Sequence, residues 1–189
     1  IEEYASHAAI FNSDYAYFSS YSSSWLAHAK TYVESMVERF GFNSDAQIVE
    51  LASNDGYLLQ YFKELDIPVL GIEPTANTAR VAEEKGIKTV VDFFGTRLAN
   101  QLVDEGYKAD LLLGNNVLAH VPDINDFVQG MKMLLNKRGV ITMEFPHLLQ
   151  LIQLNQFDTI YHEHFSYLSF ITVKRIFESC GLKMFDVQE

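Results

Sequence analysis

Apolar residues recur along the chain first at helical spacing and then in short runs, each followed by a further helical pattern. In SWLAHAKTYVESMVERF (24–40), apolar positions three and four residues apart predict a helix that ends at Gly41. Beyond it, short apolar runs bounded by turn residues predict strands. The predicted strands are AQIVELA (46–52), IPVLGIE (67–73), IKTVVDF (87–93), ADLLLGN (109–115), VITMEF (140–145) and LKMFDV (182–187), and the predicted helices between them are 56–65, 76–86, 95–106, 124–139 and 172–181.

This alternation predicts the fold class. Strands that alternate with helices form βαβ units, in which helices cover both faces of a parallel sheet. The nearly continuous apolar content of residues 48–52 and 109–113 fits strands buried on both faces. The sequence therefore predicts an α/β domain with a doubly wound, mostly parallel sheet, whose sixth strand lies at the end of the chain.

Composition and charge exclude several classes of protein. The 189 residues are 48% hydrophobic and 13% aromatic, as expected of a single globular domain. No apolar run reaches the ~20 residues of a membrane span, and the first residues do not form a signal peptide. A net charge of −11 without a stripe of Lys or Arg argues against a nucleic-acid partner. The single cysteine, Cys180, excludes an internal disulfide, so we expect a cytoplasmic protein, and we expect it to be a monomer.

The turn after the first predicted strand is a candidate cofactor site, because doubly wound sheets bind ligands at the carboxyl ends of their strands. In VELASNDGYLL (49–59), asparagine and aspartate tolerate turn geometry, and the glycine leaves room for a ligand to approach. Glu73, at the end of the second strand, is placed to accept hydrogen bonds from ribose hydroxyls. An ordinary glycine turn and a helix-capping glutamate are the alternative. The candidate residues of the turn are Ala52, Ser53, Asn54, Asp55 and Gly56.

The cofactor expected in this turn is S-adenosylmethionine. The turn lacks the G-x-G-x-x-G spacing that brings backbone amides against a pyrophosphate, so NAD is disfavoured. A ligand with a ribose but no phosphate fits better, and S-adenosylmethionine is the common one. The next two strand ends belong to the same predicted pocket: Asp92, Phe93 and Phe94 as contacts of an adenine, and Asn115, Asn116 and His120 on the side of the reaction.

The heptapeptide YHEHFSY (161–167) gathers side chains that handle protons. If it forms a helical turn, Tyr161 and His164 share a face. If it is extended, Tyr161 and Glu163 point one way while His162 and His164 point the other. A metal site that uses both imidazoles and a polar loop without chemistry are further possibilities. The heptapeptide by itself leaves all of these open.

Six stretches of the sequence, taken together, identify a family resemblance. VELASNDGYLL, GIEPT, NNVLAHVPD, EFPHL, FDTIYHEHFSYLS and the upstream YFSSYSSSWLAHAK resemble the sugar C-methyltransferases that act on nucleotide-linked keto-deoxysugars in antibiotic-sugar biosynthesis. The resemblance covers nearly the whole chain. It implies a Rossmann-like class I methyltransferase fold that binds S-adenosylmethionine.

The resemblance also implies how the chain is organised. We expect an N-terminal aromatic and Ser-rich segment with a helix (1–40) that packs on a methyltransferase core (41–189), whose catalytic segment is 155–170. Members of the family carry a zinc-binding domain before this region and a further domain after it. The chain is therefore expected to be a central portion that stops before the last strand of the family's sheet.

Methylation of a carbon next to a ketone requires a base, donors for the enolate oxygen, and attack of the enolate carbon on the sulfonium methyl group. By the resemblance, His164 is the base, and Tyr161 and His120 interact with the enolate oxygen or with sugar hydroxyls. Glu163 orients an imidazole or contacts the sugar. The methylated position that the resemblance implies is C-3 of a 4-keto-deoxysugar, and the sequence identifies neither the sugar nor its nucleotide.

Other assignments stay open at this stage. Tyr15 is expected to close over the substrate, with Tyr17 and Tyr21 as rivals, and the neighbouring serines are expected to hold the methionine end of the cofactor. An oxygen or nitrogen acceptor would also suit a histidine base. A non-catalytic module that senses a nucleoside is the alternative of another class.

Overall fold

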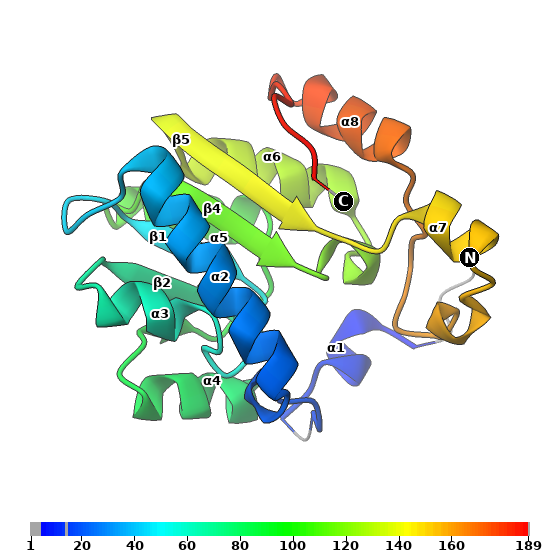
Figure 1. Cartoon of the computed structure of the whole chain (residues 1–189), viewed down its shortest axis with the longest axis horizontal. Coiled ribbons are helices and arrows are strands. Elements are labelled where there is room, and N and C mark those ends of the chain that lie inside the picture. The colour runs from blue at the N-terminus through cyan, green and yellow to red at the C-terminus, as the bar shows by residue number, and fades with distance from the viewer. Residues whose placement is uncertain (1–4, 14, 189) are drawn as a thin grey trace.

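A five-stranded sheet forms the centre of the computed structural model, which describes residues 5–13 and 15–188 (Figure 1). The strands lie in the order β3-β2-β1-β4-β5, and all of their pairings are parallel. The direction of winding reverses between β1 and β4, which is the position where doubly wound sheets bind ligands. The predicted fold class is confirmed. The strands are β1 (Ile48–Leu51), β2 (Val69–Ile72), β3 (Thr89–Val90), β4 (Ala109–Asn115) and β5 (Leu135–Glu144).

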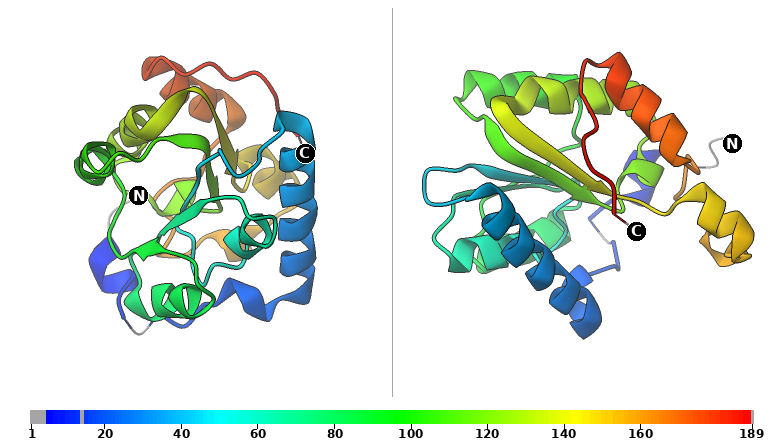
Figure 2. Two further views of the ribbon diagram at one scale, coloured as in Figure 1. Left: turned by 90° about the vertical axis from the view of Figure 1, so that its left-hand side faces the viewer. Right: turned by 45° about the horizontal axis from the view of Figure 1, so that its top comes forward.

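Helices cover both faces of this sheet, and Figure 2 shows α2 on the opposite side from α5 and α6. Short helices and 3-10 turns form the rest: α1 and η1 before α2, η2 after β4, and α7 and η3 between β5 and α8. The bounds are α1 (His7–Ile10), η1 (Ser19–Tyr21), α2 (Ser23–Phe40), α3 (Leu59–Glu64), α4 (Ala76–Glu84), α5 (Thr96–Asp104), η2 (Leu118–His120), α6 (Ile124–Leu134), α7 (Leu148–Gln153), η3 (Phe157–Thr159) and α8 (Phe170–Ser179). None of the helices in the described parts of the chain is both long and apolar enough to cross a membrane.

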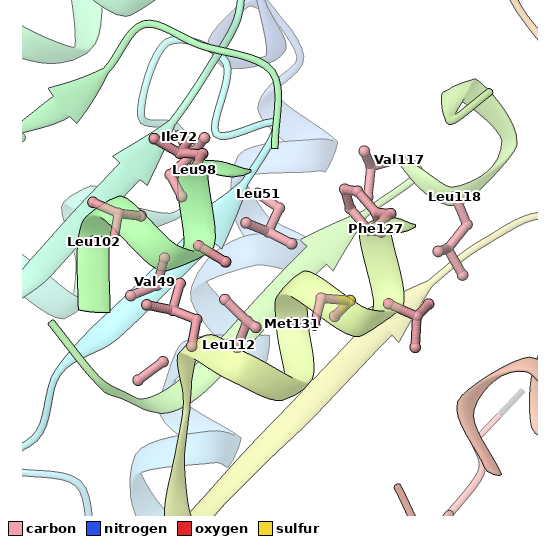
Figure 3. Packing of buried hydrophobic residues seen from close by; sticks show 14 of the residues in the cluster. Val49, Leu51, Ile72, Leu98, Leu102, Leu112, Val117, Leu118, Phe127 and Met131 are labelled. Atoms are coloured by element: carbon pink, nitrogen blue, oxygen red, sulfur yellow. The ribbon is translucent and has the colours of Figure 1, made fainter. Parts of the chain in front are cut away.

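Alternation along the strands divides the apolar side chains between the two faces. Leu112 packs with α5 and α6, in the cluster drawn in Figure 3, whereas its neighbours Leu111 and Leu113 pack with α2 and α3. Successive side chains of a strand point to opposite faces, so a strand covered on both sides must be apolar at nearly every position. This is why the strands appear in the sequence as continuous apolar runs.

The structure corrects three of the predicted elements. Residues 182–187 form no strand; Asp186 instead accepts a hydrogen bond from Arg39 of α2 at 2.5 Å. β3 is limited to Thr89–Val90. The helix predicted over 124–139 ends at Leu134, because the next residue pairs with β4 and begins β5. The division of the chain at residue 40 stays a prediction, and residues 1–4 and 14 of its first part lie outside the described residues.

The turn between β1 and α3 contains residues that enter the left-handed region of backbone conformation. Ala52 has φ 55°, Asn54 has φ 49° and Gly56 has φ 74°. A Cβ atom at Gly56 would lie 2.5 Å from Cδ1 of Ile87 and 3.2 Å from Cβ of Ala82. The glycine is therefore needed for its conformation and for packing against Ala82 of α4 and against Ile87, which precedes β3. The sequence suggested instead that it leaves room for a ligand, but it does not line the cavity described below.

We expect Gly56→Ala to lower the free energy of unfolding by about 2–4 kcal/mol, since a left-handed backbone and an overpacked contact both oppose the new methyl group. Gly41→Ala is the matched control, because Gly41 has φ 68° but no described atom lies within 4 Å of its added Cβ. It should cost only the conformational part, about 1 kcal/mol. Urea unfolding of both variants measures the difference, and equal losses would contradict the packing argument.

Candidate cofactor and catalytic site

A cavity of about 1020 Å³ lies at the carboxyl ends of β1, β2 and β4. Residues at or directly after the ends of these strands line it, among them Ala52, Glu73 and Asn115. The N-terminal segment and the turn at 161–164 line the remaining sides. The cavity thus occupies the switch point, where the sequence predicted a cofactor.

Glu73 joins the two loops at this point. Its carboxylate accepts hydrogen bonds from the backbone N–H groups of Asn54 and Thr75, both at 2.9 Å, and from the Thr75 hydroxyl at 2.5 Å. The residue is only 4% exposed, and burial raises the pKa of its carboxyl group although these hydrogen bonds oppose the shift. The position of the carboxylate is therefore fixed at the end of β2.

Most of the predicted cofactor residues line the cavity, and three do not. The Oγ of Ser53 points toward Gly71 of β2, where an added Cβ would lie 2.5 Å from it. Asp55 accepts hydrogen bonds from Ser20 N and from Lys85 Nζ, so its side chain is also turned away. Gly56 faces Ala82 and Ile87. Those that line the cavity are Ala52, Asn54, Glu73, Asp92, Phe93, Phe94, Asn115 and Asn116.

The segment YHEHFSY forms a turn and not an extended strand. The N–H of His164 donates to the carbonyl of Tyr161 at 3.1 Å, and the two rings lie 4.3 Å apart between centroids. The N–H of Phe165 donates to the carbonyl of Ala119 at 2.8 Å, which attaches the segment to η2. The rings of His120 and His164 consequently meet, with centroids 4.7 Å apart.

The hydrogen bonds of these two histidines assign their tautomers. The Nδ1 atom of His164 lies 2.8 Å from the carbonyl oxygen of Thr159, and Nδ1 of His120 lies 3.0 Å from that of Glu163. A carbonyl oxygen only accepts, so each Nδ1 must carry a proton. In the neutral form of each ring, Nε2 is then free to accept a proton.

Both imidazoles are held in the neutral form. Burial lowers the pKa of His120 to about 4, and the nearby His164 adds to this effect. Burial also lowers the pKa of His164, whereas its hydrogen bond to Thr159 and the charge of Glu163 oppose the shift. At neutral pH the site therefore presents two unprotonated Nε2 atoms.

All five predicted catalytic residues line the cavity: Tyr15, His120, Tyr161, Glu163 and His164. Burial, and secondly the charge of Glu163, raise the pKa of both Tyr15 and Tyr161, so their hydroxyl groups keep their protons. Of the rivals of Tyr15, Tyr17 also lines the cavity, whereas Tyr21 is 84% exposed and stacks on Phe18. Within residues 5–13 and 15–188, no group of three His, Cys, Asp or Glu side chains is arranged to hold a metal ion.

Several residues of the site escaped the sequence analysis. Trp25 and Tyr57 stack with centroids 6.0 Å apart and line the cavity. Both stand in stretches with a helical pattern, where an aromatic residue predicts core packing. Glu50 of β1 was missed as well, although it does not line the cavity; it is 1% exposed, and neither of its carboxylate oxygens has a hydrogen-bond partner among the described residues. An acid in the middle of an apolar strand was the available signal.

Comparison with known proteins identifies the family. Residues 25–187 match the family model described as a methyltransferase domain. Among curated proteins, the chain is 36% identical over 173 residues to the C-methyltransferase NovU of Streptomyces niveus, which covers 92% of this chain and 41% of NovU. The chain spans about two fifths of the length of that relative. The chain belongs to the methyltransferase domain family.

Solved structures share the fold at low sequence identity. A SAM-dependent methyltransferase from Archaeoglobus fulgidus superimposes with a TM-score of 0.64 at 17% identity, over 80% of this chain and 68% of that one. Magnesium protoporphyrin IX methyltransferase from Synechocystis, solved with bound S-adenosylhomocysteine (SAH), gives a TM-score of 0.64 at 12% identity, over 84% and 73%. The chain is thus a methyltransferase domain of the class that uses S-adenosylmethionine (SAM) as cofactor.

The buried Glu50 makes stability depend on pH. Burial raises the pKa of its carboxyl group well above the usual range, and the charges of Glu73 and Asp55 raise it further. Above about pH 4.3, the ordinary value of a glutamate, this carboxyl group keeps its proton in the folded protein and loses it in the unfolded chain, so stability should fall as pH rises.

We expect Glu50→Gln to weaken this decline, because the amide does not titrate. Urea unfolding at pH 5, 6, 7 and 8 measures it, and the exposed Glu38→Gln serves as the control with the same change of charge. Parallel curves for wild type and Glu50→Gln would show that Glu50 is ionised without penalty.

Proposed function

We propose that the chain is the methyl-transferring part of a C-methyltransferase that acts on a nucleotide-linked keto-deoxysugar. The similarity to NovU and the six sequence stretches named above support this reaction class. The observation that carries the proposal is the hydrogen bond from Nδ1 of His164 to the carbonyl of Thr159. It leaves an unprotonated Nε2 beside the hydroxyl-bearing ring of Tyr161, which is the pairing that enolate formation requires.

The cavity fits the cofactor in charge as well as in position. Five carboxylates line it, those of Glu73, Asp92, Asp123, Asp126 and Glu163, which favours a cationic ligand. Glu73 would hold the ribose hydroxyls, Asp92 and Phe93 the adenine, and the backbone of the β1–α3 turn the remainder. When bound, the cofactor supplies an electrophilic methyl group on its sulfonium.

His164 acts as the base in the proposed mechanism. Its Nε2 removes the proton from the carbon next to the ketone, and the carbonyl of Thr159 stabilises the resulting imidazolium through Nδ1. Burial holds the pKa of the ring below its ordinary value, so the base is available at neutral pH. The carbon that loses the proton becomes the nucleophile.

The tyrosines and His120 take different parts. Tyr161 and Tyr15 stay protonated and so can donate to the oxygen of the enolate. His120 cannot donate from Nε2 in its neutral form, because its proton is on Nδ1. Of its two expected roles, contact with a sugar hydroxyl is therefore favoured over donation to the enolate oxygen. C-3 of a 4-keto-deoxysugar is the position that the family resemblance implies.

Deuterium exchange tests proton removal separately from methyl transfer. In D₂O, with SAH in place of SAM, wild-type protein should introduce deuterium at C-3 of a nucleotide-linked 4-keto-deoxysugar, followed by mass spectrometry. His164→Asn should slow the exchange by at least about 10²-fold, and Tyr161→Phe by about 10²-fold. The exposed neighbour His162 supplies a matched control, since His162→Asn should exchange at the wild-type rate.

The same assay distinguishes other acceptors. Methyl transfer to an oxygen or nitrogen atom by a protein that exchanges no carbon-bound proton would contradict the proposal. Exchange that is unaffected by His164→Asn would reject the assigned base and leave the reaction class in place.

The charge of Glu163 should influence the pH below which deuterium exchange slows, because it acts on the pKa of His164. Because the pKa of His164 is lowered, the rate of exchange should not begin to fall until the pH is below about 6.5, the ordinary pKa of histidine. Because the charge of Glu163 raises the pKa of His164, Glu163→Gln should move the acid limb to still lower pH. The exposed Glu64→Gln is the control and should leave the limb in place. An upward shift in Glu163→Gln would contradict this electrostatic role.

A further inference from the structure

Several residues of the N-terminal segment line the cavity. His7 of α1 meets Phe93 edge to face with ring centroids 4.5 Å apart, and Phe11 meets His120 at 5.5 Å. Further along, Tyr15, Tyr17 and Ser19 line the cavity above the β1–α3 turn. We call residues 15–20 the strap. The strap shares the cavity with the residues that follow β1 and β2.

The side chain of Asn54 holds the strap at two points. Its Oδ1 accepts a hydrogen bond from Ser19 N at 2.9 Å, and its Nδ2 donates to the carbonyl of Tyr17 at 3.0 Å. Asn54 is 7% exposed, so water competes poorly for these groups. One amide therefore binds both an N–H and a carbonyl of the strap backbone.

The main chain of Asn54 is bound to the residue that follows β2. Its N–H donates to Oε2 of Glu73 at 2.9 Å, so the same residue contacts the strap and the buried acid of the cavity. Asn77 of α4 adds a second attachment, because its Nδ2 donates to the carbonyl of Tyr15 at 2.7 Å. The β1–α3 turn and the first turn of α4 thus both hold the strap.

We propose that Asn54 is a positioning residue that fastens the strap over the cofactor cavity. It keeps Tyr15 beside Glu163 and slows the departure of bound cofactor. Glu73, Asn54 and the strap line the same cavity, and Glu73 orients the backbone of Asn54. A ligand bound in the cavity therefore stabilises the fastened strap, and the fastened strap stabilises the bound ligand. Such coupling is reciprocal: a strap that slows ligand release must itself be held more firmly when the ligand is bound.

A purely structural role of the Asn54 side chain would have different consequences. If the Asn54 side chain only stabilised the fold, its loss would lower the free energy of unfolding without changing how ligand and strap affect each other. The release rate of SAH and the exchange of strap amides therefore distinguish the two. Neither measurement needs the sugar substrate, so the outcome is independent of the proposed acceptor.

Asn54→Gly is the sharpest variant. Glycine keeps φ 49° without strain and retains the backbone N–H that donates to Glu73, so the two hydrogen bonds lost are those to the strap. Stopped-flow release of SAH should be about tenfold faster, as expected for the loss of about 1.4 kcal/mol of hydrogen bonding. Hydrogen–deuterium exchange of residues 15–20 should slow on SAH binding in wild type, and this protection should be lost in the variant.

Asp66→Gly is the matched control. Asp66 also has a left-handed backbone, with φ 56°, and it is exposed in the loop after α3. It should release SAH at the wild-type rate and keep the ligand-induced protection. This comparison removes any general effect of adding a glycine to a left-handed position.

Wild-type release and wild-type protection in Asn54→Gly would overturn the proposal, as would faster release that Asp66→Gly reproduces. If Asn54→Gly does not fold, Asn54→Asp replaces it. Aspartate keeps the acceptor for Ser19 N–H but places an acceptor against the Tyr17 carbonyl, which repels it. Faster release and faster strap exchange in this variant support the proposal, and wild-type behaviour of both rejects it.

Discussion

The buried carboxylate of Glu73 is the constraint on which the geometry of the cavity depends. It accepts hydrogen bonds from the loop after β1, through Asn54, and from the loop after β2, through Thr75. These loops follow the adjacent parallel strands β1 and β2, and the carboxylate links their backbones just beyond the sheet. A charged group with several donors in a dry site is held more strongly than a surface pair. The lining of the cavity at these loops, and the strap that Asn54 holds, depend on this arrangement.

On the side of the cavity formed by the turn at 161–164, burial keeps the titratable side chains neutral. Two histidines and two tyrosines are placed where burial opposes charge, so each is held in its neutral form. The backbone carbonyls of Thr159 and Glu163 then decide which nitrogen carries the proton. At neutral pH, imidazoles without a second proton therefore lie beside protonated tyrosine hydroxyls. The acid Glu163 adjusts the balance, since its charge acts on His164, Tyr161 and Tyr15 alike.

The sequence predicted correctly those elements that are determined by interactions between residues close together in the chain. The helix at 24–40 was found at Ser23–Phe40, because an amphipathic face and a left-handed Gly41 define both its body and its end. The start of β5 was missed, because the helical pattern continues past Leu134 while pairing of Leu135 with Ala109 decides the outcome. Residues 182–187 have a strand-like composition, yet composition does not supply a partner strand.

The same limit applies to the candidate site. The loops after β1 and β2 were predictable, since strand ends can be located in a sequence and parallel sheets bring them together. The conformation of YHEHFSY was not, because its turn depends on hydrogen bonds from Phe165 and Ser166 to Ala119, more than forty positions away in the chain. Asn54 shows the limit most clearly. Its sequence context suggested a turn residue that tolerates left-handed geometry, and glycine would do this with less strain. Only the positions of Ser19 and Tyr17 give a reason for a side chain at this place, because asparagine combines a tolerated left-handed backbone with an amide that binds the strap.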